Sequence, residues 1–264
     1  MLSITGLYVR RLGGWIAAAD LVAMATYAGL SEPLARTAVT RLGKGGILVK
    51  EKREGIAGYA LTPQSERLFD RGDQRIFEVR VMHPDDPWCV ISFSLPETLR
   101  ADRAQLRRRL SRIGCGTVSP ALWICPDYLR EEVLDILDDL KIRKFAVLFR
   151  SDLPTVDGAI EDSIAQWWDL PRIAERHAEF AIRAEQLLEG SPPGDAEAFR
   201  RYVNCIDAWR AISYVDPGLP FELLPSNWPG KATVPYFRSF SERYADRAWD
   251  FAAELTSRER ASAR

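Results

Sequence analysis

The spacing of apolar residues divides the chain into successive segments with different periodicity. Residues 1–65 combine short helical repeats with one alternating stretch, which predicts two helices followed by a β-hairpin. Residues 88–155 alternate short apolar runs with amphipathic stretches, whereas residues 160–264 keep apolar residues at helical spacing nearly throughout. The charged stretch 66–87 predicts a helical connector that ends at two prolines. We therefore expect an α+β multidomain protein with an N-terminal, a middle and an all-helical C-terminal domain.

The first segment contains the pattern of a helix-turn-helix. Ala18–Ala28 predicts a short helix that Gly29 ends, and Ser31 can cap a second helix with Pro33 in its first turn. The apolar residues expected on the inner face of this second helix are Leu34, Ala35, Ala38, Val39 and Leu42. The polar residues expected on its outer face are Arg36, Thr37, Thr40, Arg41 and Lys44. The pattern thus predicts one buried and one basic, solvent-facing side.

A β-hairpin is predicted directly after the second helix. Leu48–Glu54 alternates in polarity, Gly55–Gly58 is expected at the tip, and Tyr59–Leu61 returns. The outgoing strand carries the basic residues Lys50, Lys52 and Arg53. Helix, turn, helix and basic hairpin in this order predict a winged helix-turn-helix.

Charge is distributed unevenly and supports a nucleic-acid partner for this domain. The whole chain has a formal net charge of −1, but the eight basic and four acidic side chains of residues 1–64 give that part a net charge of +4. Arginine can pair with a guanine edge, threonine can meet a thymine methyl or a phosphate, and lysine neutralises phosphate. A basic helix alone is usually a solvated face, so the prediction depends on the helices and the hairpin together. The expected contacts to double-stranded operator DNA are Arg36, Thr37, Thr40, Arg41, Lys44, Lys50, Lys52 and Arg53.

The middle segment has the order of a small ferredoxin-like sheet. Its expected strands and helices alternate as β-α-β-α-β, with room for one further strand. In chain order they are the strand Trp88–Ser94, the helix Leu99–Ile113, the strand-like stretch Gly114–Cys125 with a break at Pro120, the helix Tyr128–Leu140 and the strand Phe145–Phe149.

The last segment predicts long helices separated by a proline-rich turn. One continuous amphipathic helix is expected over Ile164–Leu188, a second over residues 196–214, and a third from about Pro235 to Arg260. His177 falls in the middle of the first of these helices and is expected at the surface. The turn between the second and third helices contains four prolines between residues 217 and 229.

Four stretches of the sequence resemble the PaaX family, bacterial repressors of phenylacetic acid catabolism. They are Arg10–Ile16 (RRLGGWI), Gly29–Ile47 (GLSEPLARTAVTRLGKGGI), Gly114–Pro126 (GCGTVSPALWICP) and Asp216–Gly230 (DPGLPFELLPSNWPG). The resemblance implies a winged helix, a middle ferredoxin-like domain related to a small CRISPR-associated nuclease but inactive, and a helical C-terminal domain. It also implies a homodimer on a palindromic operator, released by an acyl-CoA thioester, which is phenylacetyl-CoA in the best-known members.

The candidate effector site lies in the C-terminal segment, which is also the candidate for dimerisation. Trp209, Arg210 and Trp228 combine aromatic surface with a cation, as an aryl- or acyl-CoA would require. Asp207 stands where family members often have a histidine, so the resemblance leaves the identity of the effector open. Aromatic residues at such spacing also suit ordinary helix packing.

The remaining features argue against other classes of function. No Ser-His-Asp or phosphate-loop motif is present, so we expect no enzyme and no cofactor. A nuclease is the main alternative, but the first middle strand ends in Ser92-Phe93-Ser94 without a carboxylate for a metal ion. An interaction module that never contacts DNA is the other alternative.

Cellular context is predicted from the cysteines and from hydropathy. The four cysteines form no metal-binding spacing, so reduced, buried thiols and no metal site are expected. No apolar run is long enough to span a membrane, and no signal-peptide pattern begins the chain. A cytoplasmic protein that does not associate with membranes is therefore expected.

Overall fold

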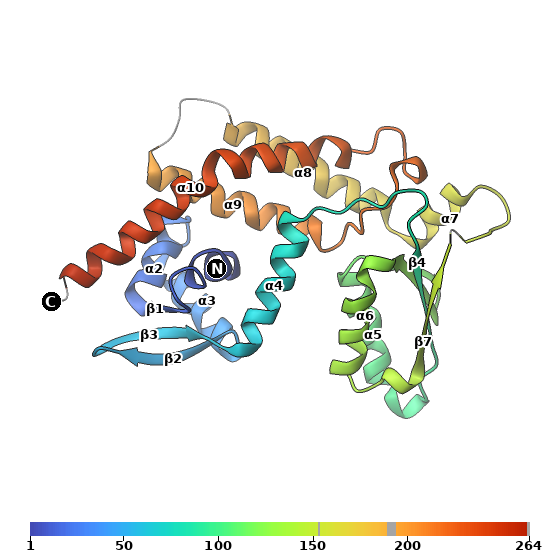
Figure 1. Cartoon of the computed structure of the whole chain (residues 1–264), viewed down its shortest axis with the longest axis horizontal. Coiled ribbons are helices and arrows are strands. Elements are labelled where there is room, and N and C mark those ends of the chain that lie inside the picture. Colours follow the sequence, from blue (N-terminus) through green and yellow to red (C-terminus); the bar gives the residue numbers. More distant parts are fainter. Residues whose placement is uncertain (153, 189–193, 263–264) are drawn as a thin grey trace. The chain divides into compact units, whose positions relative to one another are not determined.

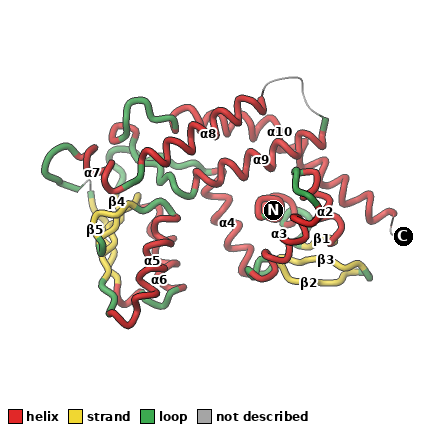
Figure 2. Tube along the Cα trace, turned by 180° about the vertical axis from the view of Figure 1, so that it is seen from behind, coloured by secondary structure: helices red, strands yellow, loops and turns green. Residues whose placement is uncertain are grey.

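The computed structural model describes residues 1–152, 154–188 and 194–262 (Figures 1 and 2). It is a mixed α+β protein with two small antiparallel sheets. Its contacts divide the chain into two compact units. Unit 1 comprises residues 1–78, 180–209 and 234–264, and unit 2 comprises residues 79–179 and 210–233. Residues 160–264, predicted as one helical domain, therefore contribute to both units.

Unit 1 begins with a helical segment that runs from Leu2 to Val9. Its elements are α1 (Leu2–Ile4), η1 (Thr5–Val9), β1 (Trp15–Ala17), α2 (Ala18–Tyr27), α3 (Glu32–Lys44), β2 (Leu48–Arg53), β3 (Ile56–Leu61) and α4 (Pro63–Phe77). The sheet has the order β1-β3-β2, with Trp15 opposite Ala60 on one side of β3 and Val49 opposite Ala60 on the other. The helix, turn, helix and hairpin thus occur in the predicted order (Figure 1).

The turns of unit 1 are formed by residues suited to them, with one exception. Gly29 has a φ of +100° after α2, which favours glycine. Thr62 caps α4 by accepting a hydrogen bond from the Ser65 backbone N–H at 3.2 Å, while Pro63 begins the helix. Ser31 precedes α3 with extended dihedrals, but its side chain makes no capping hydrogen bond. The prediction that Ser31 caps this helix is therefore only half right.

Unit 2 is built on a four-stranded antiparallel sheet with the order β5-β6-β4-β7. Its elements are β4 (Trp88–Phe93), η2 (Glu97–Leu99), α5 (Arg100–Arg112), β5 (Gly116–Ser119), β6 (Leu122–Pro126), η3 (Asp127–Leu129), α6 (Arg130–Asp139), η4 (Arg143–Phe145), β7 (Ala146–Ser151), α7 (Ile160–Trp167) and η5 (Phe221–Leu223). Pro120 lies in the turn between β5 and β6, so the stretch predicted as one interrupted strand is a hairpin. That hairpin supplies the further strand and completes a β-α-β-β-α-β order.

The two faces of this sheet contribute to different apolar cores. Cys89, Ile91 and Phe93 alternate along β4 and pack in one core with residues of α5 and α6. Trp88 points to the other face and packs with Trp168, which follows α7. Successive side chains of β4 therefore alternate between two apolar cores, one on each face of the sheet.

Three long helices follow, and the first differs from its prediction. The helices are α8 (Leu170–Leu188), α9 (Asp195–Ser213) and α10 (Gly230–Ser262). The helix expected over Ile164–Leu188 is broken at Trp168, whose φ of −120° and ψ of 145° are extended. Pro171 disfavours helical dihedrals in the residue before it, and the Asp169 carboxylate accepts the Arg172 backbone N–H at 3.2 Å. None of the helices in the described part of the chain is long and apolar enough to cross a membrane.

Replacing Gly58 by alanine should strongly destabilise unit 1. A Cβ atom at this position would lie 2.4 Å from the Ile16 carbonyl oxygen and 2.5 Å from Cζ2 of Trp15, so β1 would have to move. We expect a loss of about 3 kcal/mol in the free energy of unfolding, measured by urea denaturation followed by circular dichroism. Ala57→Ser, at the exposed neighbouring position, is the control and should change stability little. An unchanged urea midpoint for Gly58→Ala would contradict the close packing of β1 on β3.

Candidate nucleic-acid interface

The outer face of α3 is exposed along its length, as its polar pattern predicts. Ala35 and Val39 are buried beneath it, at 0% and 3% exposure. All five polar side chains predicted to face outward are exposed, namely Arg36, Thr37, Thr40, Arg41 and Lys44. Leu34 was expected to pack inward but is 62% exposed, because the first turn of α3 extends beyond the core. The exposed face of α3 is therefore wider than predicted and begins with an apolar residue.

The side chains on this face differ in how they are already engaged. Arg36 forms an ion pair with Glu32 one turn earlier, at 2.5 Å between Nη2 and Oε1. The hydroxyls of Thr37 and Thr40 donate to the carbonyls of the residues four positions before them, at 2.9 and 3.0 Å. Arg41 and Lys44 have no ion-pair partner among the described residues. Of the three cations on α3, these two can reach an external anion without breaking an internal ion pair.

The hairpin β2–β3 presents its basic residues in two directions. Lys50 and Lys52 are exposed and two residues apart, so they share one face of β2. Arg53 pairs with Glu51 at 2.5 Å and lies 5.6 Å from the centre of the Trp15 ring. The two lysines are therefore the hairpin cations most available to an external phosphate.

The hairpin tip lies earlier in the chain than predicted. Glu54 and Gly55 connect the strands, with φ values of 47° and 87°. Two consecutive residues with positive φ are typical of the tight two-residue turns that match strand twist. The prediction placed the tip at Gly55–Gly58, but Ile56 already pairs with Arg53 in the ladder. Gly58 has a packing role instead, because Trp15 covers it.

Three of the four residues predicted to bind an effector, Asp207, Trp209 and Trp228, have side-chain partners in the structure. Asp207 accepts a hydrogen bond from the Ser3 hydroxyl, within unit 1. Trp209 is 1% exposed, stacks on Phe237 with ring centres 4.7 Å apart, and donates its indole N–H to the Ile76 carbonyl at 3.0 Å. These contacts are those of a core tryptophan.

The other two predicted effector residues belong to unit 2. Arg210 lies in the last turn of α9, and Trp228 is 5% exposed. The Trp228 ring stands edge-on to the ring of His177, 5.9 Å away. Trp209 and Trp228 therefore pack in the cores of different units, each against its own set of partners.

His177 is buried, which corrects the prediction that it lies at the surface. It is 1% exposed, and its Nδ1 and Nε2 atoms lie 2.7 Å from the Thr233 hydroxyl and the Asp216 carboxylate. Trp228 also packs against the His177 ring. His177 of α8 therefore contacts both ends of the proline-rich segment and the start of α10. The imidazole is not accessible to a substrate, so this network holds the backbone of the proline-rich segment in place.

The sequence pattern did not predict the hydrogen-bond network around His177, although its partners lie in stretches of recognisable pattern. Asp216 begins the stretch Asp216–Gly230 that resembles the family, Trp228 lies near its end, and both contact His177. A histidine on a charged helix gave no sign of burial by itself. The aspartate and the tryptophan near the two ends of this stretch were the available sign that a buried polar partner lies between them.

The cysteines are free and buried, as their spacing predicts. A hydrogen bond with Cys125, directly opposite in the sheet, and burial both raise the pKa of the Cys89 thiol. Burial raises the pKa of Cys205 to about 12. Both thiols are thus poor nucleophiles at neutral pH.

Of the acidic residues before β4, Asp86 has a structural contact. The Asp86 carboxylate accepts the His83 backbone N–H at 2.9 Å, which closes the turn before the strand. No group of three potential metal ligands occurs within the residues that the structure describes.

The fold and these surfaces define a mixed α+β protein with a Cas2-like middle domain, and family models identify it further. They are described as PaaX-like protein over residues 1–65, PaaX protein central Cas2-like domain over residues 82–164 and PaaX-like protein C-terminal domain over residues 168–254. Together they match most of the chain, which therefore belongs to the PaaX family.

Individual proteins resemble the chain over nearly its whole length. Transcriptional repressor PaaX from Escherichia coli (strain K12) is 25% identical over 260 residues, which are 96% of this chain and 81% of that protein. The solved structure of the uncharacterized protein Rv0674 from Mycobacterium tuberculosis has a TM-score of 0.58 at 23% identity. That match covers 95% of this chain and 97% of the other, and it shows a common fold.

Removing the Thr233 hydroxyl should destabilise unit 2 through His177. Thr233→Val keeps the shape of the side chain but leaves Nδ1 of the buried imidazole without its partner. We expect the free energy of unfolding to fall by about 1–3 kcal/mol, measured from the urea midpoint. Thr256→Val is the matched control in the same helix, because that buried hydroxyl only donates to the backbone of its own helix, 3.0 Å from the Ala253 carbonyl. Equal losses in both variants would show that Thr233 contributes only packing.

Proposed function

We propose that this chain is a transcriptional repressor that binds double-stranded operator DNA through a winged helix-turn-helix formed by α2, α3 and the hairpin β2–β3. The observation that supports this most strongly is the fully exposed outer face of α3, where Arg41 and Lys44 have no internal ion pair. Membership of the PaaX family and the similarity to a protein named as a transcriptional repressor support the same function.

The proposed binding mode places α3 in the major groove. An α-helix fits that groove, and the residues of its N-terminal half meet base edges. Leu34 and Thr37 would face thymine methyl groups, since the exposed Leu34 side chain and the Thr37 methyl offer apolar contact while the Thr37 hydroxyl is engaged. Arg36 would exchange its ion pair with Glu32 for a base or phosphate.

Arg41 would pair with a base edge, and Lys44 and the hairpin would then follow the phosphate backbone beside the groove. Lys50 and Lys52 share one face of β2, which suits contacts to successive phosphates. Arg53, which contacts Glu51 and Trp15, would support the hairpin and reach the minor groove from its tip. Such contacts release counterions, so binding should weaken steeply with salt.

An aryl- or acyl-CoA thioester is the proposed signal that releases the repressor, and a phenylacetate-like catabolic operon the proposed target. This part rests on the resemblance to the family. Asp207, Trp209, Arg210 and Trp228 stay predicted effector contacts, although the packing of both tryptophans supports a core role more directly. A useful switch requires the ligand to favour the DNA-free state by about 1–3 kcal/mol.

Replacing Arg41 by alanine should weaken operator binding by about 1–3 kcal/mol and relax one operator position. Arg41 is exposed on the outer face of α3 and pairs with no described acidic residue. Gel-shift titrations on a selected operator and on single-base variants measure both effects. Arg108→Ala, which removes another exposed arginine, from α5, is the control and should bind as the wild type does. Unchanged binding by Arg41→Ala would mean that α3 does not face the DNA.

The protein should form a homodimer in solution. One winged helix contacts only a few base pairs, so a specific affinity of about 10⁻⁸ M or tighter usually needs two half-sites. The sheet of unit 2 and the long helices are the candidate interfaces. Light scattering at micromolar concentration, with and without operator DNA, measures the mass. A monomer under both conditions would contradict the prediction.

A further inference from the structure

Trp15 connects all three strands of the sheet β1-β3-β2, here called the hairpin sheet. Its backbone lies opposite Ala60 of β3, and its ring covers Gly58 of the same strand, where an added Cβ would lie 2.5 Å from Cζ2. The indole N–H reaches β2 and donates to the Glu51 carbonyl at 3.3 Å. One side chain of β1 therefore bridges both strands of the hairpin.

The tryptophan is buried in a small apolar cluster that belongs to the hairpin sheet. Trp15 is 5% exposed and packs with Ala17 and Ala60, and half-buried Ile56 packs against them. Ile16 is also buried but points to the opposite face, because successive residues of a strand alternate. All four members of this cluster come from β1 and β3, so the largest of them stabilises the hairpin sheet itself.

The same face of the hairpin sheet carries Arg53, the last residue of β2. Arg53 lies opposite Ile56, and Glu51 lies opposite Gly58, so both side chains share a face with Trp15. The guanidinium carbon lies 5.6 Å from the centre of the Trp15 ring, and Nε lies 2.5 Å from Oε1 of Glu51. The Arg53 side chain is still 47% exposed. Ring and carboxylate thus hold this cation near the hairpin tip without covering it.

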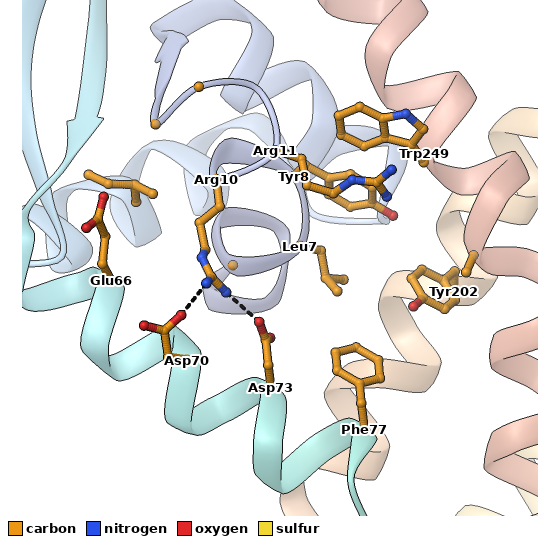
Figure 3. Close-up of a pocket in the computed structure, with 15 residues that line it drawn as sticks. Leu7, Tyr8, Arg10, Arg11, Glu66, Asp70, Asp73, Phe77, Tyr202 and Trp249 are labelled. Carbon is orange, nitrogen blue, oxygen red and sulfur yellow. Dashed lines mark hydrogen bonds and ion pairs between the residues drawn. The ribbon is translucent and has the colours of Figure 1, made fainter.

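The backbone before β1 is itself anchored, so the tryptophan starts from a fixed point. Figure 3 shows the ion pairs of Arg10 with two aspartates of α4, Asp70 and Asp73. In the turn that follows, the Gly14 carbonyl accepts the Leu61 backbone N–H at 2.8 Å. Strand β1 is therefore tied to α4 and to the end of β3 where it begins.

An arginine held in one orientation suits the minor groove of DNA. A narrow, A·T-rich minor groove concentrates negative potential and attracts arginine, whereas the 2-amino group of guanine projects into the groove of a G·C pair. A side chain that is already held loses less conformational entropy on binding than a freely rotating one. Glu51 contacts Nε of Arg53, and neither Nη group has a hydrogen-bond partner among the described residues.

We propose that Trp15 is a positioning residue that holds Arg53 in the orientation required to contact an A·T-rich minor groove beside the base pairs contacted by α3. The inference rests on the proposed function and deepens it, because it gives the hairpin a sequence preference of its own. Trp15 acts through Arg53 and the Glu51 backbone and touches no DNA. Lys50 and Lys52, on the opposite face of β2, contribute phosphate contacts without such a preference.

Gel-shift titrations with three operator duplexes test the preference. The base pairs flanking the selected half-sites are made A·T, G·C or inosine·cytosine. Inosine lacks the 2-amino group, so its pair with cytosine resembles A·T in the minor groove and G·C in the major groove. The wild type should bind the A·T and inosine flanks alike and the G·C flank at least fivefold more weakly. Arg53→Ala should bind all three alike.

Variants of the tryptophan test the positioning role. Trp15→Leu should remove the preference as fully as Arg53→Ala does, and the double variant should lose nothing further. Trp15→Phe keeps a ring beside the guanidinium but loses the indole donor, so it should keep part of the preference. Lys52→Ala is the matched control, since it removes a hairpin cation from the other face and should weaken binding to all three duplexes equally.

Circular dichroism gives the folded fraction of each variant under the conditions of the gel shift. Should Trp15→Leu fail to fold, the comparison of Trp15→Phe with Arg53→Ala decides the question. Equal binding of the wild type to G·C and inosine flanks would overturn the proposal. Trp15 variants that weaken binding to all three duplexes by one factor, with the preference intact, would also overturn it, because the tryptophan would then be only structural.

The proposed function is tested separately by the same titrations. Operator binding that depends on Arg41 but not on the flanking pairs would leave the proposed function standing and remove the role of Trp15. A chain that binds none of the duplexes would refute the proposed function, and the positioning role with it.

Discussion

Burial of the first helical segment, Leu2–Val9, is the constraint on which unit 1 depends. Ile4, Tyr8 and Val9 are almost completely buried, and partners come from elements far apart in the sequence. At Gly6 an added Cβ would lie 2.8 Å from Cδ1 of Phe69 in α4, so only glycine allows these two helices to approach so closely. Such packing on all sides fixes where the hairpin sheet and the long helices can lie around the segment.

This packing explains how a weakly buried helix can still be presented rigidly. Among its thirteen residues α3 fully buries only Ala35 and Val39, too little apolar surface to hold the helix by itself. Its position is set by α2 and by the hairpin, and the hydroxyl of Thr62, which follows the hairpin, donates to the Gly46 carbonyl at 2.5 Å just after the helix. The outer face of α3 is then not needed for packing within the protein, so it can bind another molecule.

Helices and strands were predicted well where the spacing of apolar residues agrees with the positions of prolines and glycines that end an element. The prediction failed where contacts between distant residues decide whether a side chain is buried. Alternation along β4 and the helical spacing of α5 and α6 locate the middle sheet closely. Leu34 shows the limit, because 3.6-residue periodicity assigns a face but not whether anything covers it. His177 shows the reverse case, a polar residue whose burial depends on Asp216 and Thr233, 39 and 56 positions away.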